Sequence, residues 1–139
     1  MSQLETYIFF DGNCADAMRY YERVLGGKME IMMAHKDSPE AQNVPPEMAD
    51  RIIHARLDIG GRKLMASDSM IGTPIGGARG FSLSLSYPDE AEAKKVFDAL
   101  SDSGRVTMPM QATFWARAFG MVVDKFGTSW MVNGGQSPM

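Results

Sequence analysis

The sequence predicts an α+β fold made of two βαβββ modules, which form a curved mixed sheet with the helices on its outer face. Three observations predict this fold. The order strand, helix and three strands occurs twice along the 139 residues. A segment rich in glycine, with one proline, at 71–77 separates the two copies. A content of 45% hydrophobic and 22% charged residues is typical of a globular chain that buries a continuous core.

We therefore predict one domain over 1–139, with a first module at 1–70 and a second at 79–139. A ferredoxin-like α+β sandwich with extra strands is the structural alternative. The repeat is one of element order and not of residue identity, so the sequence alone leaves both open.

The first module begins with a strand of β-branched and aromatic residues and continues with a helix whose apolar residues recur at helical spacing. Asn13 is the expected N-cap of this helix, and Gly26 and Gly27 end it. The predicted elements are, in order, a strand at 6–10, a helix at 14–25, a strand at 29–34, a loop at 36–50, and a hairpin of strands at 51–59 and 62–69.

The second module begins with a strand that alternates apolar residues with Ser82, Ser84 and Ser86. We expect its apolar residues, Phe81 among them, to pack on the helix and the serines to face the other way. Asp89 is the expected N-cap of the second helix. The predicted elements are, in order, a strand at 81–87, a helix from 89 to Gly104, and strands at 105–111, 117–124 and 129–133.

Composition and charge limit the partners and the compartment. A net charge of −3 without a basic run gives no footprint for nucleic acid or for an anionic membrane surface. No apolar stretch is long enough to span a bilayer, and the N-terminus does not resemble a secretory signal. The single cysteine, Cys14, fits a reducing compartment. We expect a cytoplasmic protein whose partner is a small molecule or a second copy of itself.

Five ordered stretches resemble the PhnB-like branch of the vicinal-oxygen-chelate (glyoxalase, bleomycin-resistance and dioxygenase) superfamily. They cover nearly the whole chain and lie at 7–27, 54–57, 65–68, 113–116 and 123–130. The resemblance implies a ligand cleft on the concave side of the sheet and a homodimer. In metal-dependent members of the superfamily, two histidines and one or two glutamates of both halves hold a divalent ion.

Comparison with that ligand pattern predicts a cleft without a metal. The positions that correspond to three of the family's ligands hold Thr6, Ser82 and Met131, which are poor ligands for hard divalent ions. We therefore predict no cofactor. An atypical divalent-metal site that uses His54, Asp68 and another carboxylate is the alternative.

The candidate ligand-binding residues are His54, Arg56, Asp68, Phe114, Trp115 and Arg117. We expect His54 and Arg56 to face the cleft, because Ala55 and Leu57 on the same strand suit the helix side. His54 suits proton transfer near neutral pH, and a hydrogen-bonded structural histidine is the alternative.

Each of the other candidates also has a structural alternative. Arg56 could clamp an anion or pair with Asp58 or Asp68. Asp68 could orient His54, act as a base or accept hydrogen bonds in a turn. Phe114 and Trp115 could wall a pocket or an interface, and Arg117 could reach an anionic ligand.

Three other residues invite a functional role but are expected to be structural. Trp130 is expected in the core, and Asp124 in a structural role at the turn before the last strand. Cys14 stands at the start of a helix, where a thiolate is favoured, but it also belongs to the buried stripe. An inert, buried thiol is the expectation.

The sequence supports two classes of function. The first is a protein that binds a small molecule in an aromatic, metal-free cleft. The second is a metal-dependent enzyme of the glyoxalase or lyase type, so catalytic activity and catalytic residues stay open. Members of the PhnB-like branch are often labelled methyltransferases, but the chain has no glycine-rich loop between a strand and a helix, with a following acidic residue, to hold S-adenosylmethionine.

Overall fold

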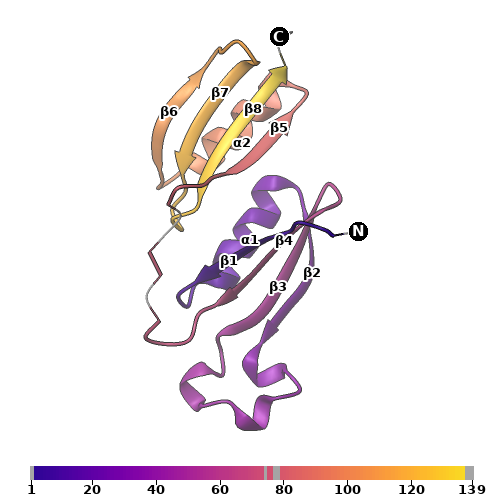
Figure 1. The fold of residues 1–139 in the computed structure, drawn as a ribbon, viewed down its shortest axis with the longest axis vertical. Coiled ribbons are helices and arrows are strands. Elements are labelled where there is room, and N and C mark those ends of the chain that lie inside the picture. The colour runs from indigo at the N-terminus through magenta and orange to yellow at the C-terminus, as the bar shows by residue number, and fades with distance from the viewer. Residues whose placement is uncertain (1, 74, 77–78, 137–139) are drawn as a thin grey trace. The chain divides into compact units, whose positions relative to one another are not determined.

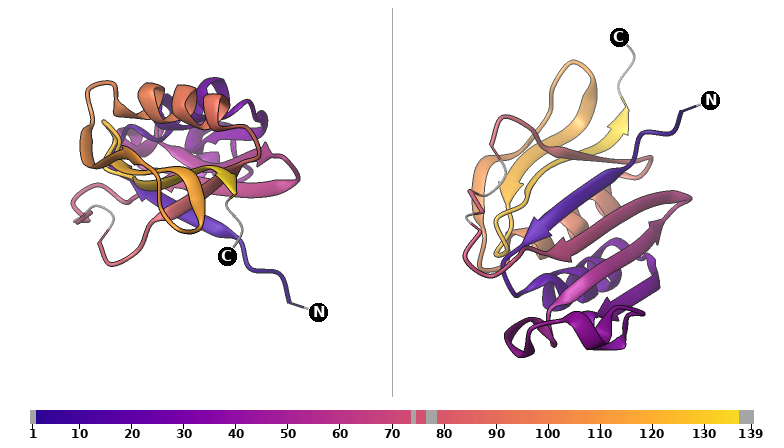
Figure 2. Two further views of the ribbon diagram at one scale, coloured as in Figure 1. Left: turned by 90° about the horizontal axis from the view of Figure 1, so that it is seen from above. Right: turned by 60° about the horizontal axis from the view of Figure 1, so that its bottom comes forward.

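The computed structural model describes residues 2–73, 75–76 and 79–136. The chain divides into two compact units, Met1–Ile75 and Gly76–Met139. The boundary between them falls within the predicted connection 71–77, of which residues 74 and 77 lie outside the described part. Figures 1 and 2 show a mixed sheet with one α-helix along one face in each unit.

The first unit folds as one βαβββ module. Its strands and helix are β1 (Thr6–Phe10), α1 (Cys14–Leu25), β2 (Lys28–Ala34), β3 (Ile52–Ile59) and β4 (Arg62–Asp68). The sheet order is β1-β4-β3-β2, with β1 parallel to β4 and the other pairs antiparallel. The loop predicted at 36–50 contains three short 3-10 helices, at His35–Asp37, Ala41–Asn43 and Pro46–Met48.

Helix α1 covers one face of this sheet because its apolar stripe meets the small and aliphatic residues of β3 and β4. Ala55 and Leu57 of β3, and Ala66 of β4, are fully buried, as are Ala17 and Met18 of α1. Residues opposite one another in a ladder point to the same face of a sheet, so the register divides every strand into two sets. We call the face without an α-helix the helix-free face.

The second unit repeats the same order with β5 (Leu83–Tyr87), α2 (Glu90–Ser101), β6 (Arg105–Gln111), β7 (Ala116–Val123) and β8 (Ser129–Gln136). Its sheet order, β5-β8-β7-β6, matches that of the first unit, again with a parallel first pair. The predicted α+β fold with two βαβββ modules is therefore confirmed.

Glycines allow α2 to lie close to its sheet. A Cβ on Gly134 of β8 would lie 2.5 Å from the Cβ of Ala93, and one on Gly120 of β7 would lie 2.6 Å from the ring of Phe97. These distances are shorter than van der Waals contact, so the two strands need glycine where the helix crosses them.

Some boundaries differ from the prediction. The strand expected at 81–87 begins at Leu83, and Phe81 is 61% exposed instead of packed on the helix. The strand predicted to end at Asn133 continues to Gln136. Asn13 makes no side-chain hydrogen bond at the start of α1, whereas Asp89 caps α2 as predicted, accepting from the amide of Ala91 at 3.0 Å.

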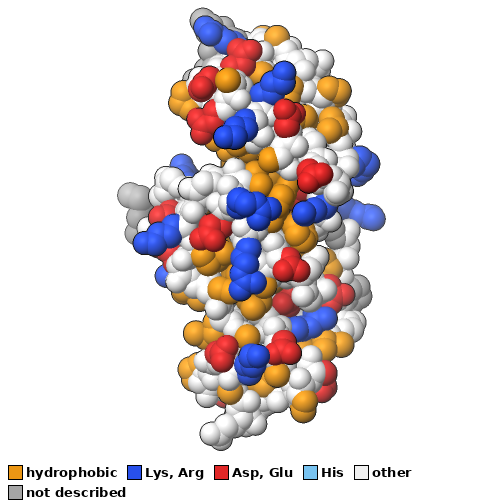
Figure 3. All heavy atoms as spheres, turned by 180° about the vertical axis from the view of Figure 1, so that it is seen from behind, with side chains coloured by type: hydrophobic (Ala, Val, Ile, Leu, Met, Phe, Trp, Pro, Cys, Tyr) orange, Lys and Arg blue, Asp and Glu red, His pale blue; other side chains and the backbone are white. Residues whose placement is uncertain are grey.

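The surface carries charges of both signs. On the face drawn in Figure 3, basic and acidic side chains alternate with hydrophobic ones. Within the described residues, no helix is long and apolar enough to cross a membrane.

Candidate functional site

His54 lies on the helix-free face of the first unit, as predicted. It is the ladder partner of Met33 on β2. Ala55 and Leu57 on the same strand are buried under α1, so alternation along the strand places His54 on the opposite face. Its ring stacks on that of Tyr7, with centroids 5.8 Å apart, and the Tyr7 hydroxyl lies 3.4 Å from His54 Nδ1. Polar and aromatic groups therefore meet on this face.

Arg56 shares this face but is held by a carboxylate. Its Nε donates to Glu30 Oε1 at 3.0 Å, and Lys63 Nζ donates to both oxygens of Glu30 at 3.0 Å. The hydrogen bond from Lys63, followed by that from Arg56, lowers the pKa of the Glu30 carboxyl. The partner of Arg56 is thus Glu30, and not Asp58 or Asp68 as expected.

Asp68, a candidate ligand-binding residue, lies on the other face of the sheet, so it does not orient His54, and of its alternative roles the structure supports the acceptance of backbone hydrogen bonds. It is the ladder partner of Phe10, which is 4% exposed, and is itself 7% exposed. Oδ1 accepts from the amides of Gly12 and Cys14 at 2.9 and 3.0 Å, and Oδ2 accepts from the amide of Ile52 at 2.9 Å. Asp68 therefore caps α1 and joins it to the start of β3.

Cys14, the first residue of α1, is a buried thiol. It is fully buried, and desolvation, followed by the negative charge of Asp68, raises the pKa of its thiol to about 12. The protonated form is favoured at neutral pH, so Cys14 does not act as a thiolate nucleophile in the folded protein.

We expect Cys14 to react with Ellman's reagent only after unfolding. At pH 8 the native protein should show less than a tenth of the rate seen in denaturing urea, because the reactive thiolate is both scarce and covered. Rapid, stoichiometric release of the thionitrobenzoate product from the native protein would contradict this placement of Cys14.

In the second unit, Trp115 lies against the helix-free face. Its ring meets that of Phe119 on β7 edge-on at a centroid distance of 5.2 Å, and Phe114 meets Trp115 in the same manner at 4.8 Å. Trp115 Nε1 donates to Asn133 Oδ1 at 3.1 Å. Since Asn133 is the ladder partner of Phe119, all these groups belong to one face.

Asn133 holds Trp115 in a defined orientation. Its Nδ2 donates to Ser84 Oγ at 3.3 Å and to the carbonyl of Leu85 at 3.2 Å, while Oδ1 receives the indole N–H. Both ends of the amide therefore have partners, Nδ2 on the neighbouring strand β5 and Oδ1 on Trp115 in the connection before β7. The indole N–H is satisfied, and the rest of the Trp115 ring presents apolar surface.

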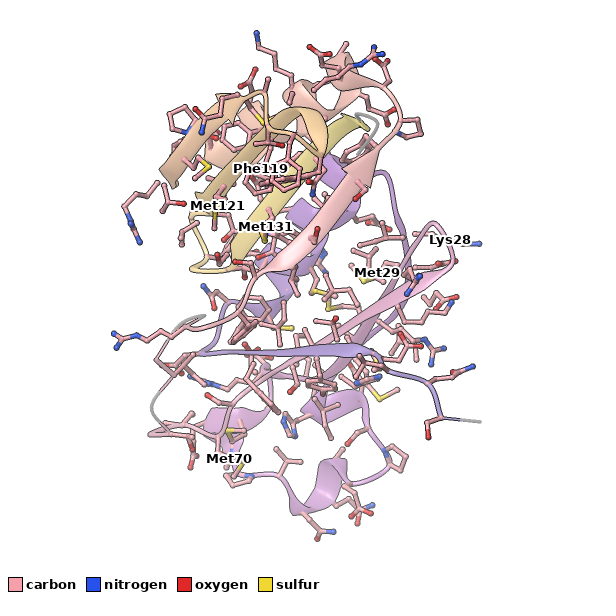
Figure 4. The ribbon with its side chains drawn as sticks, turned by 45° about the horizontal axis from the view of Figure 1, so that its top comes forward. Lys28, Met29, Met70, Phe119, Met121 and Met131 are labelled. Carbon is pink, nitrogen blue, oxygen red and sulfur yellow. The ribbon has the colours of Figure 1, made fainter. Side chains whose placement is uncertain are left out.

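Methionines extend this surface along the sheet. Figure 4 shows Phe119, Met121 and Met131 on neighbouring strands β7 and β8. Met121 pairs with Met131 and also with Met108 of β6, so three thioethers form one row across three strands. Thioether side chains are polarisable and adaptable, which suits a surface that contacts an apolar ligand.

Arg117 marks one end of the same face. Its aliphatic chain crosses Gly135, where an added Cβ would lie 3.1 Å from Arg117 Cδ. Together with Pro88, Glu90 and Lys94 it lines an open hollow of about 500 Å³ beside the first turn of α2. Arg117 has no ion-pair partner in the described part of the chain.

The described residues do not fit a divalent-metal site. No three His, Cys, Asp or Glu side chains come together among residues 2–73, 75–76 and 79–136. The atypical site that would combine His54 with Asp68 is contradicted, because the two side chains lie on opposite faces of one sheet. On the helix-free face of the first unit, Glu30 is engaged by Arg56 and Lys63.

The three positions compared with metal ligands lie in different surroundings. Thr6 pairs with the buried Leu64 and therefore faces α1, not the helix-free face. Ser82 precedes β5, and its Oγ lies 2.6 Å from Ser129 Oγ. Met131 is on the helix-free face of the second unit, as expected.

Other predicted roles are confirmed. Trp130 is 2% exposed, and its Nε1 donates to Asp124 Oδ2 at 2.8 Å, while Asp124 Oδ1 accepts from the amides of Phe126 and Thr128 in the turn. The sequence interpretation missed Phe119 and Asn133. Alternation along β7 and β8 places Phe119 and Asn133 on the face opposite to that of the buried residues Ala118 and Val132, and this signal could have identified them.

The chain matches a family model and a curated relative over nearly all its length. The family model described as 3-demethylubiquinone-9 3-methyltransferase matches residues 2–133. Protein YjdN of Escherichia coli (strain K12) is 40% identical over 140 residues, which cover 94% of this chain and 93% of YjdN.

Solved structures agree with this assignment. Protein PA1353 from Pseudomonas aeruginosa has a TM-score of 0.88 at 44% identity, covering 96% of this chain and 98% of its own. The putative 3-demethylubiquinone-9 3-methyltransferase, PhnB protein, from Bacillus cereus has a TM-score of 0.82 at 23% identity, over 96% and 99% of the two chains.

The fold also matches that of FosX, the fosfomycin resistance protein of Listeria monocytogenes, with a TM-score of 0.66 at 6% identity over 96% and 92% of the two chains. A likeness at this identity concerns the fold alone. The chain belongs to the family described as 3-demethylubiquinone-9 3-methyltransferase, and it shares its fold with the PhnB protein from Bacillus cereus and with FosX.

Proposed function

We propose that this protein binds a small organic molecule on the helix-free face of its second unit. The observation that carries the proposal is the oriented aromatic group, in which Asn133 holds Trp115 edge-on against Phe119. Such a preorganised wall loses little conformational entropy when a ligand packs on it. Ligand sites are commonly apolar surfaces with a few fixed polar groups, and Ser84 and Asn133 supply those here.

The proposed function does not include the methyltransferase activity named in the family description. The connection from β1 to α1, 11–13, contains a single glycine, and that from β5 to α2, 88–89, contains none. Neither provides the glycine-rich turn that lets a backbone approach a nucleotide-type cofactor closely. Binding requires only the surface itself.

The helix-free face of the first unit is the second candidate surface. It offers His54 beside Tyr7 and Phe9, which are 40% and 56% exposed. There, however, Arg56 is already engaged by Glu30. If small aromatic compounds changed the NMR chemical shifts of the His54 ring but not the fluorescence of Trp115, this surface would be favoured instead.

We expect the emission of Trp115 to change when a ligand binds. The chain has only two tryptophans, and Trp130 is buried in the core, so Trp115→Phe leaves one emitter that is insensitive to the site. In a titration with a chemically diverse panel of small aromatic compounds, at least one should quench or shift the wild-type emission at micromolar concentration. The same compound should leave the emission of Trp115→Phe unchanged.

Trp130→Phe is the matched control for this experiment. It should keep the response, because Trp115 remains, once a melting curve shows that the variant is folded. Silence of the wild-type protein across the panel, or an equal response in Trp115→Phe, would refute the proposed site.

A further inference from the structure

The charges on the helix-free face of the second unit are all positive in the described part of the chain. Its two central rows contain no ionisable side chain, and the register gives their members as Met108, Met121, Met131 and Ser84, and Gln111, Phe119, Asn133 and Ser86. The ends of the face carry arginines. Arg117 precedes the Phe119 row, and Arg105, the ladder partner of Val123, follows the methionine row. A neutral apolar centre with cationic ends fits an anionic ligand better than a cationic one.

The two arginines differ in how they are built into the fold. Arg105 begins the edge strand β6 and is exposed. Arg117 belongs to the inner strand β7, and its stem lies over Gly135, whose φ of +62° and lack of a side chain leave the path open. Any larger residue at position 135 would be strained and would also meet the Arg117 stem.

Arg117 also faces a space that a ligand group can enter. The hollow of about 500 Å³ that it lines contains a second cation, Lys94. Two carboxylates also line the hollow: that of Asp89, which accepts from the amide of Ala91, and that of Glu90. Met121 lies four positions along β7 from Arg117, or about 13 Å at the rise of a β-strand. Phe119, between them, is 3% exposed and packs against the ring of Trp115.

We infer that the ligand is an amphiphilic anion, whose apolar body covers Trp115 and Met121 while its carboxylate, phosphate or sulfonate group meets Arg117. This inference rests on the proposed function and adds the ligand class and the end at which its charge lies. A guanidinium binds such oxyanions through two parallel hydrogen bonds, which fixes direction as well as affinity. Lys94 of α2 lines the same hollow as Arg117 and adds a second positive charge there.

Two fluorescent probes that differ only in a sulfonate test the inference: 8-anilinonaphthalene-1-sulfonate, which is anionic, and N-phenyl-1-naphthylamine, which is neutral. We expect the anionic probe to bind the full-length protein at least tenfold more tightly than the neutral one. Increasing the NaCl concentration from 0.05 to 0.5 M should lower the affinity for the anionic probe only, because salt screens its attraction to the arginine.

Arginine variants assign the preference to one end of the face. Arg117→Ala should remove the tenfold preference and change the affinity for the neutral probe less than twofold, and Arg117→Lys should keep part of it. Arg105→Ala is the matched control at the other end and should change neither affinity by more than twofold. Circular dichroism confirms that each variant is folded.

The outcomes separate the two proposals. If neither probe binds, or if Trp115→Phe does not lower the affinity for either probe, the proposed function fails. If both probes bind equally, or if Arg105→Ala has the effect expected of Arg117→Ala, the proposed function stands and the amphiphilic anion is wrong.

Discussion

Replacement of Asp68 by alanine should lower the free energy of unfolding by about 3–5 kcal/mol. The carboxylate accepts from three backbone amides, those of Gly12, Cys14 and Ile52, and is 7% exposed. Removal of the acceptor leaves buried donors without a partner, and each such donor costs about 1–3 kcal/mol. The start of α1 and the start of β3 would both lose their anchor.

Urea denaturation monitored by circular dichroism measures this loss, with Asp58→Ala as the matched control. Asp58 is a partly exposed carboxylate that accepts from the amide of Gly61 at 2.9 Å and lies 3.7 Å from Lys63. The control should lose less than about 1 kcal/mol, since exposed interactions of this kind contribute little. Equal losses in the two variants would show that Asp68 is not the anchor we describe.

The order of the elements could be predicted because it follows from local periodicity. Alternation along β3 placed His54 and Arg56 opposite Ala55 and Leu57, and the register confirms that division. The same reasoning placed the side chains of Ser84 and Leu83 on different faces of the second sheet, as the register shows. Side-chain direction in a strand depends only on its neighbours in sequence, so a single strand carries the information.

The roles of Asp68 and Asn13 could not be predicted in this way. Asn13 stands at the N-cap position by every local criterion, yet Asp68, 54 residues from Cys14, supplies the hydrogen bond to the start of α1. The choice between a local and a distant acceptor depends on the parallel pairing of β1 with β4, which brings Phe10 beside Asp68. The sequence around Asn13 and around Asp68 does not indicate that β1 pairs with β4.

The aromatic site shows the same limit. Phe114 and Trp115 were recognisable as large aromatic residues in a connection, but the residue that orients Trp115 is Asn133 on β8. Its role depends on the antiparallel register of β7 and β8, which sets Phe119 opposite Asn133. A site assembled across strands becomes visible only when the register is known.

Replacement of Gly134 by alanine should lower the free energy of unfolding by about 2–3 kcal/mol, because the added methyl group has no space. Its Cβ would lie 2.5 Å from the Cβ of Ala93 and 3.1 Å from the Cα of Glu90, both close to the backbone of α2. A flexible side chain could move aside, but here the helix itself must shift away from β8.

The double variant Gly134→Ala with Ala93→Gly separates this collision from other effects. Removal of the Ala93 methyl group opens the space that the new one needs, so the double variant should be more stable than the sum of the two single losses predicts, even though glycine in a helix costs about 1 kcal/mol. Gly76→Ala, where an added Cβ meets nothing within 4 Å, should leave stability unchanged. Thermal melts of the wild-type protein and these four variants measure the differences. Strict additivity of the two single losses would show that close packing of α2 on β8 is not what requires glycine at position 134.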